Sequence, residues 1–188
     1  IPAYNEEGGV GKVVKDFSQP FVDEVIVIDN NSDDRTAYFA RKAGAKVVPE
    51  TKQGYGHAII RGLKEAKGDL IFVTEADTTF LGEDMGKFLA YSNDADVVLG
   101  TRVTRELLSK GAKMDWFLLY GNIFIAKLIQ LRFWGKTRLT DVGCTFRMIK
   151  RQSLQKIIKK FTVGGPAFSP EMILLALKHG LRVVEIPV

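Results

Sequence analysis

The sequence predicts an α/β fold, with a mostly parallel central sheet flanked by helices. Short apolar strands alternate with helical patterns along the chain, which is typical of a parallel sheet with covering helices. The chain has 188 residues, of which 46% are hydrophobic and 26% charged, and this is the size and composition of one folded domain with its own core. We therefore expect residues 1–188 to form a single domain.

The first half of the chain follows this alternation closely. Val10, Val13, Val14 and Phe17 recur at the spacing of one helix face. Gly44 ends the second helical pattern, since glycine adopts the left-handed conformation that closes many helices. The expected elements are, in order, a helix over 10–17, a strand over 24–29, a helix over 34–43, a strand over 46–48 and a helix after 54–56.

In the second half, a long apolar and aromatic segment over 107–134 interrupts the rhythm. Ser169 is expected to cap a helix that has Pro170 at its first position and Gly180 at its end. The other expected elements are a strand over 70–74, a helix over 83–91, a strand over 96–99, a strand over 144–149, a helix over 152–160 and a strand over 182–186.

The strand over 70–74 runs directly into two carboxylates, Glu75 and Asp77, with Ala76 between them. Because strand residues alternate faces, this spacing aims both carboxylates at the same side of the strand end. Such a pair suits a hard cation such as Mg²⁺, which takes few protein oxygens and shares its other positions with substrate phosphates. The alternative is that the acidic residues merely cap the following turn.

Polar clusters follow the strands at four places along the chain. Ligands of open α/β sheets bind outside the carboxyl ends of the strands, so one cleft is expected to collect all four clusters. The clusters are residues 2–7, 29–34, 52–56 and 75–77.

Charge and cysteine content narrow the classes of partner. A net charge of +5 and a pI near 9.3 favour acidic partners such as nucleotide phosphates or anionic lipids. A nucleic-acid binder is disfavoured because the strands carry no basic and aromatic set for stacking bases. The lone Cys144 excludes an internal disulfide and fits a reducing cytosol. Because the chain starts at Ile1 without a Met and stops at Val188, we expect an excerpt of a longer protein.

Seven motifs in order resemble those of family 2 glycosyltransferases of GT-A fold, particularly the dolichyl- and polyprenyl-phosphate sugar synthases and related bacterial enzymes. They cover residues 1–7, 27–36, 54–68, 68–77, 98–102, 141–147 and 171–188. Three positions depart from the family pattern. Glu75 stands where the family has the first Asp of Asp-x-Asp, Asn30 replaces the second residue of an Asp pair, and Thr145 occupies a common Gly position.

The resemblance implies a nucleotide-sugar donor, UDP- or GDP-linked, and a Mg²⁺ or Mn²⁺ ion. It implies that Asp77 and Glu75 hold the metal and that the Asp29 carboxylate accepts the imide N–H of the base. The donor-binding residues that it implies are Pro2, Tyr4, Glu6, Asp29, Gly54, Glu75 and Ala76. For a single Asp29 or Tyr4, a turn cap or a packed loop aromatic is the plain alternative.

On the acceptor side, the resemblance implies that Asp141 is the catalytic base or the acceptor-positioning residue, with Glu171 second. A carboxylate in a first helical turn, such as Glu171, is equally explained by the helix dipole. Arg102 and Arg147 are expected to grip phosphate through their planar guanidinium groups, although surface solvation is the default role of any one arginine.

The resemblance thus predicts a metal-dependent inverting glycosyltransferase that uses polyprenyl phosphate as acceptor at the cytoplasmic face of a membrane. The mixture of aromatic and basic residues over 107–134 suits an interfacial or acceptor-side helix. The alternatives are a core helix of this domain and an interface with further sequence of the protein. A glycan hydroxyl as acceptor, an inert nucleotide-sugar binding module and a sugar-phosphate nucleotidyltransferase remain open, the last disfavoured by acidic residues after the first strand.

Overall fold

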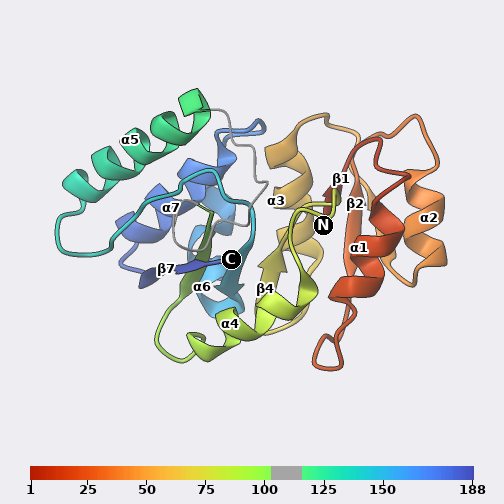
Figure 1. Cartoon of the computed structure of the whole chain (residues 1–188), viewed down its shortest axis with the longest axis horizontal. Helices are drawn as coiled ribbons and strands as arrows, with labels where there is room; N and C mark the ends of the chain where they lie inside the picture. Colours follow the sequence, from red (N-terminus) through yellow and green to blue (C-terminus); the bar gives the residue numbers. More distant parts are fainter. Residues whose placement is uncertain (103–115) are drawn as a thin grey trace.

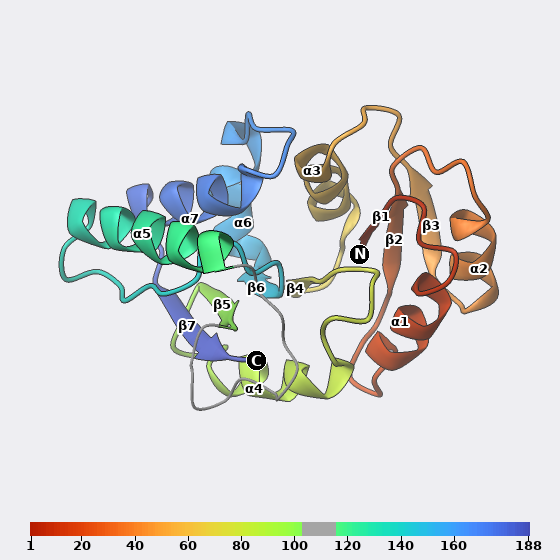
Figure 2. The same ribbon diagram turned by 45° about the horizontal axis from the view of Figure 1, so that its top comes forward.

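The computed structural model describes residues 1–102 and 116–188, whose strands form two sheets (Figures 1 and 2). The first sheet is parallel throughout, in the order β1 (Pro2–Ala3), β2 (Ile26–Asp29) and β3 (Lys46–Pro49). The second has the order β4 (Leu70–Val73), β6 (Arg147–Lys150), β5 (Val97–Thr101) and β7 (Val183–Pro187). Only β6 runs antiparallel to its neighbours among these described strands, so the arrangement is mostly parallel, as expected.

Helices connect most of the strands. They are α1 (Val10–Phe17), α2 (Thr36–Lys42), α3 (Tyr55–Glu65), α4 (Met85–Ala90), α5 (Trp116–Arg132), α6 (Arg151–Ile157) and α7 (Phe168–Lys178), with short 3₁₀ turns at Gly82–Asp84 and Ile158–Lys160. In Figure 2, α1 and α2 cover one face of the first sheet and α3 lies on the other. On the second sheet, α4 lies on one side and α5, α6 and α7 lie on the other (Figure 2).

Strand alternation divides the core of the second sheet into two layers. Val97 and Leu99 of β5 pack with α3, α6 and α7, while Val98 between them packs with α4. This alternation is the period of two that a sheet covered on both faces requires. The second sheet is therefore buried on both of its faces.

An aromatic cluster fills the α4 side of this core. The Phe146 ring lies at its centre, with ring centroids 4.4 Å from Phe88 and 5.6 Å from Phe17. Phe17 is the last residue of α1, so the cluster joins the helices of the two sheets. Such aromatic pairs add to the free energy of burial, by about 0.5–1.5 kcal/mol each.

Several boundaries differ from the sequence-based expectation. Helix α7 starts at Phe168, with Ala167 as its cap, because the fully buried Phe168 ring anchors the first turn in the core. Ser169 is therefore inside the helix and is not its cap. Strand β6 covers only Arg147–Lys150, since the preceding residues form a loop. The two-residue strand β1 has too little pattern to be predicted.

Part of the long apolar segment lies outside the described residues, namely 107–115. The remainder forms α5 and the turn after it. Of the helices that the structure describes, none has the length and apolar character needed to cross a bilayer.

Candidate functional site

A cleft of about 360 Å³ lies at the carboxyl ends of β1, β2 and β4 and at the start of α3. All four polar clusters contribute to it, as the sequence predicted. Its walls consist of Pro2, Ala3, Tyr4, Glu6, Asn30, Gln53, Gly54, Tyr55, Ala58, Glu75, Ala76 and Asp77. A second cavity, of about 290 Å³, lies between β2 and β4 and is lined mainly by apolar side chains. We take the first as the site because it gathers the polar groups.

Backbone and side-chain hydrogen bonds join the loops that follow β1 and β2. The Asn5 N–H donates to the Ser32 hydroxyl at 3.1 Å, and the Asp33 N–H donates back to the Asn5 amide oxygen at 2.9 Å. Asn5 has a φ of 54°, a left-handed conformation that asparagine tolerates. The Glu6 N–H donates to the Thr36 hydroxyl at 2.7 Å. These bonds fix the backbone on which Tyr4 and Glu6 face the cleft.

Asn30 lines the cleft, and its role could not be assigned from the sequence, in which it is a departure from the family pattern. Its side chain is 4% exposed, and its amide nitrogen donates to the carbonyls of Glu50 and Lys52 at 3.0 and 2.8 Å. Its amide oxygen accepts the Gly54 N–H at 2.8 Å. An aspartate could not donate to two carbonyls, so the amide explains why Asn30 follows Asp29 here. Asn30 thus holds the 50–54 loop over the cleft.

Three carboxylates, those of Glu6, Glu75 and Asp77, face the same cleft. Burial raises the pKa of Glu6, and the charges of Asp77, Asp34 and Glu75 raise it further. Asp77 is exposed, and its Oδ1 accepts the Thr79 N–H at 2.9 Å. A cation in the cleft would relieve the mutual repulsion of these carboxylates.

The carboxylates of the cleft fit Mg²⁺ or Mn²⁺, with the protein supplying only some of the ligands of the ion. Carboxylate oxygens are the ligands that such hard cations prefer. Among residues 1–102 and 116–188, no three His, Cys, Asp or Glu side chains are grouped as a complete metal site. Glu75 and Asp77 would therefore supply part of the coordination, and phosphate oxygens and water would supply the rest.

Asp29 lies at the end of β2, beside the residues that line the cleft. Its Oδ1 accepts the Ser32 N–H at 3.2 Å, which shapes the turn between β2 and α2. Gly54 has a φ of 142°, and a side chain there would collide with the Gly164 carbonyl. Only glycine fits this approach, which brings the 162–166 loop against the start of α3.

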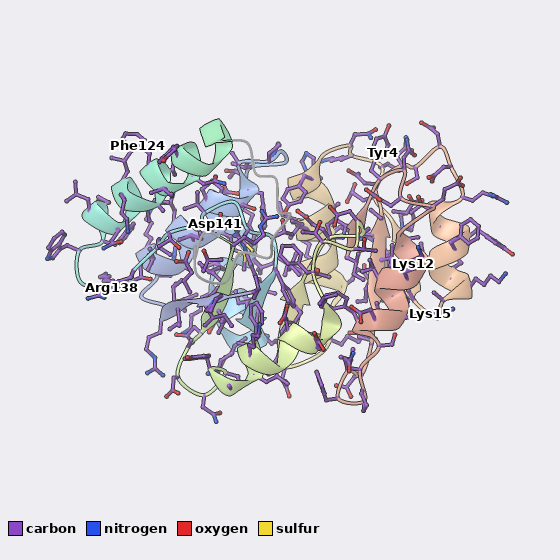
Figure 3. The ribbon with its side chains drawn as sticks, in the orientation of Figure 1. Tyr4, Lys12, Lys15, Phe124, Arg138 and Asp141 are labelled. Carbon is purple, nitrogen blue, oxygen red and sulfur yellow. The ribbon has the colours of Figure 1, made fainter. Side chains whose placement is uncertain are left out.

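The Asp141 carboxylate is 1% exposed and organises a tight loop. Its Oδ1 accepts the N–H groups of Gly143 and Cys144 at 2.9 and 3.1 Å, and its Oδ2 accepts the Arg102 N–H at 3.4 Å. Glu185 of β7 accepts the Asp141 N–H at 2.8 Å, and burial raises the pKa of Glu185. Figure 3 shows Asp141 near the middle of the molecule and Tyr4 at the rim of the first half.

Arg147 does not have the phosphate-binding geometry expected from the sequence. It is buried, and its Nε, Nη1 and Nη2 donate to the carbonyls of Cys144, Ser169 and Val142 at 2.7, 2.6 and 2.9 Å. Burial lowers the pKa of this guanidinium. Arg147 therefore braces the loop before β6 against α7.

Glu171 likewise makes structural hydrogen bonds, whereas the sequence analysis expected a catalytic role for it. Its two carboxylate oxygens accept the N–H groups of Thr162 and Val163 at 2.9 and 3.1 Å, and one also accepts the Thr162 hydroxyl at 2.7 Å. The carboxylate thus holds the loop that leads into α7. This is the use of a first-turn carboxylate that the helix terminus favours.

Arg102 lies just after β5, and its guanidinium is 5.4 Å from the centre of the Phe80 ring. In the part of the chain that the structure describes, its buried Nε has no hydrogen-bond partner. Of the two arginines expected to bind phosphate, Arg102 has an N–H group without a hydrogen-bond partner among the described residues, whereas all three nitrogens of the Arg147 guanidinium donate to carbonyls.

Comparisons with known proteins agree on one family. The model of the family "Glycosyl transferase family 2" matches residues 1–158. A dolichyl-phosphate hexose transferase of Haloferax volcanii is 33% identical over 190 residues, which cover 98% of this chain and 78% of that protein. The low-salt glycan biosynthesis hexosyltransferase Agl6 of the same organism is 30% identical, and the match covers 46% of its length.

Solved structures share the fold. Glucosyl-3-phosphoglycerate synthase from M. tuberculosis superposes with a TM-score of 0.74 at 19% identity, over 100% of this chain and 69% of that one. A structure of the same synthase in complex with Mn²⁺, UDP and phosphoglyceric acid gives a TM-score of 0.74 at 20% identity, over 99% of this chain and 66% of that one.

Proposed function

This chain belongs to glycosyl transferase family 2, and from that premise we propose that it transfers a sugar from a nucleoside diphosphate to polyprenyl phosphate at the cytoplasmic face of a membrane. We propose that the transfer needs Mg²⁺ or Mn²⁺ and inverts the anomeric centre. The observation that carries the proposal is the cleft in which Glu6, Glu75 and Asp77 lie together beside Tyr4 and Gly54.

The cleft suits a nucleoside diphosphate in size and chemistry. Its volume, about 360 Å³, is within the range of small-molecule sites. Tyr4 offers an exposed ring for stacking. The base and ribose would lie among Pro2, Glu6, Gly54 and Ala76, which line the cleft, with Asp29 beside them at the end of β2. Asp77 and Glu75 would hold the metal, which when bound stabilises the negative charge of the leaving diphosphate. That a structural neighbour was solved with Mn²⁺ and UDP supports a divalent ion.

In the proposed reaction, an acceptor oxygen attacks the anomeric carbon from the face opposite the diphosphate. The bond to the acceptor forms while the bond to the diphosphate breaks, and the nucleoside diphosphate leaves. A lipid phosphate is largely ionised near neutral pH, so it needs no general base. Asp141 then acts by holding the loop that faces the acceptor, and Arg102 contributes a donor for phosphate.

Two features support a lipid acceptor. The relative from Haloferax volcanii is named a dolichyl-phosphate hexose transferase. In addition, α5 exposes large apolar side chains together with cations and has no acidic residue over 116–138. The exposed apolar side chains are Tyr120, Phe124, Ile125, Leu128 and Leu131 of α5 and Trp134 of the turn after it. Aromatic and basic groups on one surface suit the interface of an anionic membrane.

The deciding experiment offers two acceptors to one labelled donor. UDP-, GDP- and CDP-sugars are first ranked by calorimetry, with and without Mg²⁺ or Mn²⁺. The preferred labelled donor is then given to the protein in liposomes that contain polyprenyl phosphate, and separately with soluble saccharides. Lipid-linked product from the first arm alone is expected. Product only with a saccharide hydroxyl would replace the proposed acceptor, and donor binding without transfer to either acceptor would favour a binding module.

A further inference from the structure

The pairing of β4 with β6 places Glu75 opposite Thr145. In this antiparallel pair, Val73 is the partner of Arg147, and the register runs without a bulge from there back to Leu70 and Lys150. Continuing it by two residues on each strand brings Glu75 and Thr145 together. Both residues depart from the family pattern, so the two departures face each other.

A chain of hydrogen bonds connects this pair to α3. The Thr145 hydroxyl lies 2.5 Å from Glu75 Oε1, and the Tyr55 hydroxyl lies 2.6 Å from the Thr145 hydroxyl. An ionised carboxylate only accepts, so Thr145 must donate to Glu75. Its single proton is then used, and Tyr55 must donate to Thr145. The direction of both bonds is therefore fixed.

Glu75 needs such a restraint because of its neighbours. The charges of Asp77 and Glu75 both raise the pKa of Glu6, which shows how closely the acidic groups interact. Repulsion would move a flexible glutamate side chain away from this group. Thr145 is 2% exposed, so its hydroxyl is held in place by the core around it. Glu75 Oε2 has no hydrogen-bond partner within residues 1–102 and 116–188, so it remains available to a ligand.

We propose that Thr145, oriented by Tyr55, is the positioning residue that holds the longer Glu75 side chain in place as a ligand of the donor's divalent metal. This inference rests on the proposed function of the cleft. Fixing Oε1 would leave Oε2 free to coordinate the metal, and it removes most of the rotamer freedom that a free glutamate would lose on binding. The hydroxyl makes the Glu75 replacement compatible with metal binding.

The test measures the affinity of Mn²⁺ in the presence of UDP, by calorimetry and by the electron paramagnetic resonance signal of bound Mn²⁺. Thr145→Val keeps the shape and removes the hydroxyl, and it is expected to weaken Mn²⁺ binding about tenfold. Thr145→Ser should restore most of the affinity. The matched control is Thr74→Val, because the buried Thr74 hydroxyl has no partner among the described residues. This control should bind Mn²⁺ as the wild type does.

Two further variants extend the test, and the first of them keeps the inference testable if Thr145→Val folds poorly. Tyr55→Phe should weaken Mn²⁺ binding by a smaller factor, since Thr145 keeps its bond to Glu75. In a Glu75→Gln background, Thr145→Val should cause no additional loss, because the group that it positions is absent. Wild-type Mn²⁺ affinity in folded Thr145→Val, or equal affinities for Thr145→Val and Thr145→Ser, would overturn the inference. A wild type that binds neither UDP nor Mn²⁺ would instead overturn the proposed function.

Discussion

Two carboxylates with different surroundings, Asp77 in the loop after β4 and Asp141 in the loop before β6, have different roles. Asp77 is exposed, with one oxygen bound to the Thr79 N–H, whereas Asp141 is buried and accepts three backbone N–H groups. A carboxylate with a free oxygen in an open cleft can bind a metal or a phosphate-linked cation. One enclosed by backbone donors shapes the loop around it.

Asp77→Asn should therefore abolish most of the metal-dependent transfer while it preserves the fold. We expect turnover to fall at least about 100-fold, since an amide oxygen is a weaker ligand and carries no charge. The free energy of unfolding should change by less than about 0.5 kcal/mol, as at other exposed positions. Turnover and Mn²⁺ affinity are compared with those of Asp94→Asn, an exposed aspartate elsewhere on the chain. Wild-type turnover of Asp77→Asn would exclude the proposed metal role.

Asn30→Asp should loosen the loop over the cleft. The substitution replaces a donor of two hydrogen bonds with an acceptor that faces the Glu50 and Lys52 carbonyls. We expect a loss of about 1–3 kcal/mol in the free energy of unfolding, together with weaker donor binding. Chemical denaturation measures the first effect, with the exposed Asn93→Asp as control. An unchanged stability would mean that the loop does not depend on these two bonds.

The sequence predicted which side chains at strand ends would meet in the cleft, but it did not predict their hydrogen-bond partners. Glu6, Glu75 and Asp77 meet in the cleft because strand order alone brings their loops together. The roles of Asn30 and Thr145 depend on which carbonyls and side chains lie opposite them, and this follows only from strand register. A motif likewise cannot distinguish a buried arginine brace from a phosphate ligand, which is why the expectation for Arg147 failed.

At the scale of elements, α5 is the helix with the most exposed apolar surface in the described part of the chain. Phe124 is 64% exposed, and Figure 3 shows it projecting from the outer side of α5. Arg132 is the last residue of α5 and Lys136 lies in the turn after it, and each has its cation over the Phe133 ring. Other helices, such as α1, bury their apolar residues in the core. An exposed apolar surface such as that of α5 is typical of a contact site for a membrane or another protein.

Phe124→Glu should weaken binding to vesicles of anionic phospholipid about tenfold or more. The substitution removes an aromatic group worth about 1.5–3 kcal/mol on burial and adds a charge that the membrane repels. Vesicle co-sedimentation measures the effect, and calorimetry with the donor checks that the cleft is unaffected. Tyr38→Glu is the control, since Tyr38 is an aromatic residue of α2 that is 55% exposed. Equal vesicle binding by both variants would exclude α5 as the membrane contact.

Periodicity predicted most helices because their apolar stripes are visible without a partner. The start of α7 was shifted since a capping sequence, Ser169-Pro170, competes there with the burial of Phe168, and burial prevails. The antiparallel direction of β6 could not be predicted from its hydrophobic pattern, because a strand buried on both faces has the same composition in either direction.

At the scale of the whole molecule, Asp96 joins segments that are far apart in the sequence. Its Oδ1 accepts the Ser153 hydroxyl of α6 at 2.7 Å, and its Oδ2 accepts the Arg182 N–H before β7 at 2.8 Å. Burial opposes the charge of Asp96, but these two hydrogen bonds and the charges of Lys150 and Lys156 outweigh it and lower its pKa. The ionised form therefore stabilises the packing of the second sheet.

The contribution of Asp96 should vanish in acid. Because its pKa is lower in the folded than in the unfolded chain, its stabilisation is complete above the unfolded value of about 3.9 and is lost as the pH falls through the folded value. Asp96→Asn should thus be less stable than the wild type at pH 7, and the difference should shrink below about pH 4. Urea denaturation across this pH range measures it. A difference that is independent of pH would mean that shape, and not charge, is what Asp96 contributes.

Because Cys144 is buried, its reactivity reports how often the loop that carries Asp141 and Thr145 opens. Burial raises its pKa to about 12, the Asp141 charge adds to the effect, and the chain has no other cysteine. Thiol reagents attack the thiolate, so labelling must wait until the loop opens. The native protein should react far more slowly than the chain in denaturant, as absorbance of the released reagent reports. The labelling rate then reports how often the loop that carries Asp141 and Thr145 opens, without any engineered probe.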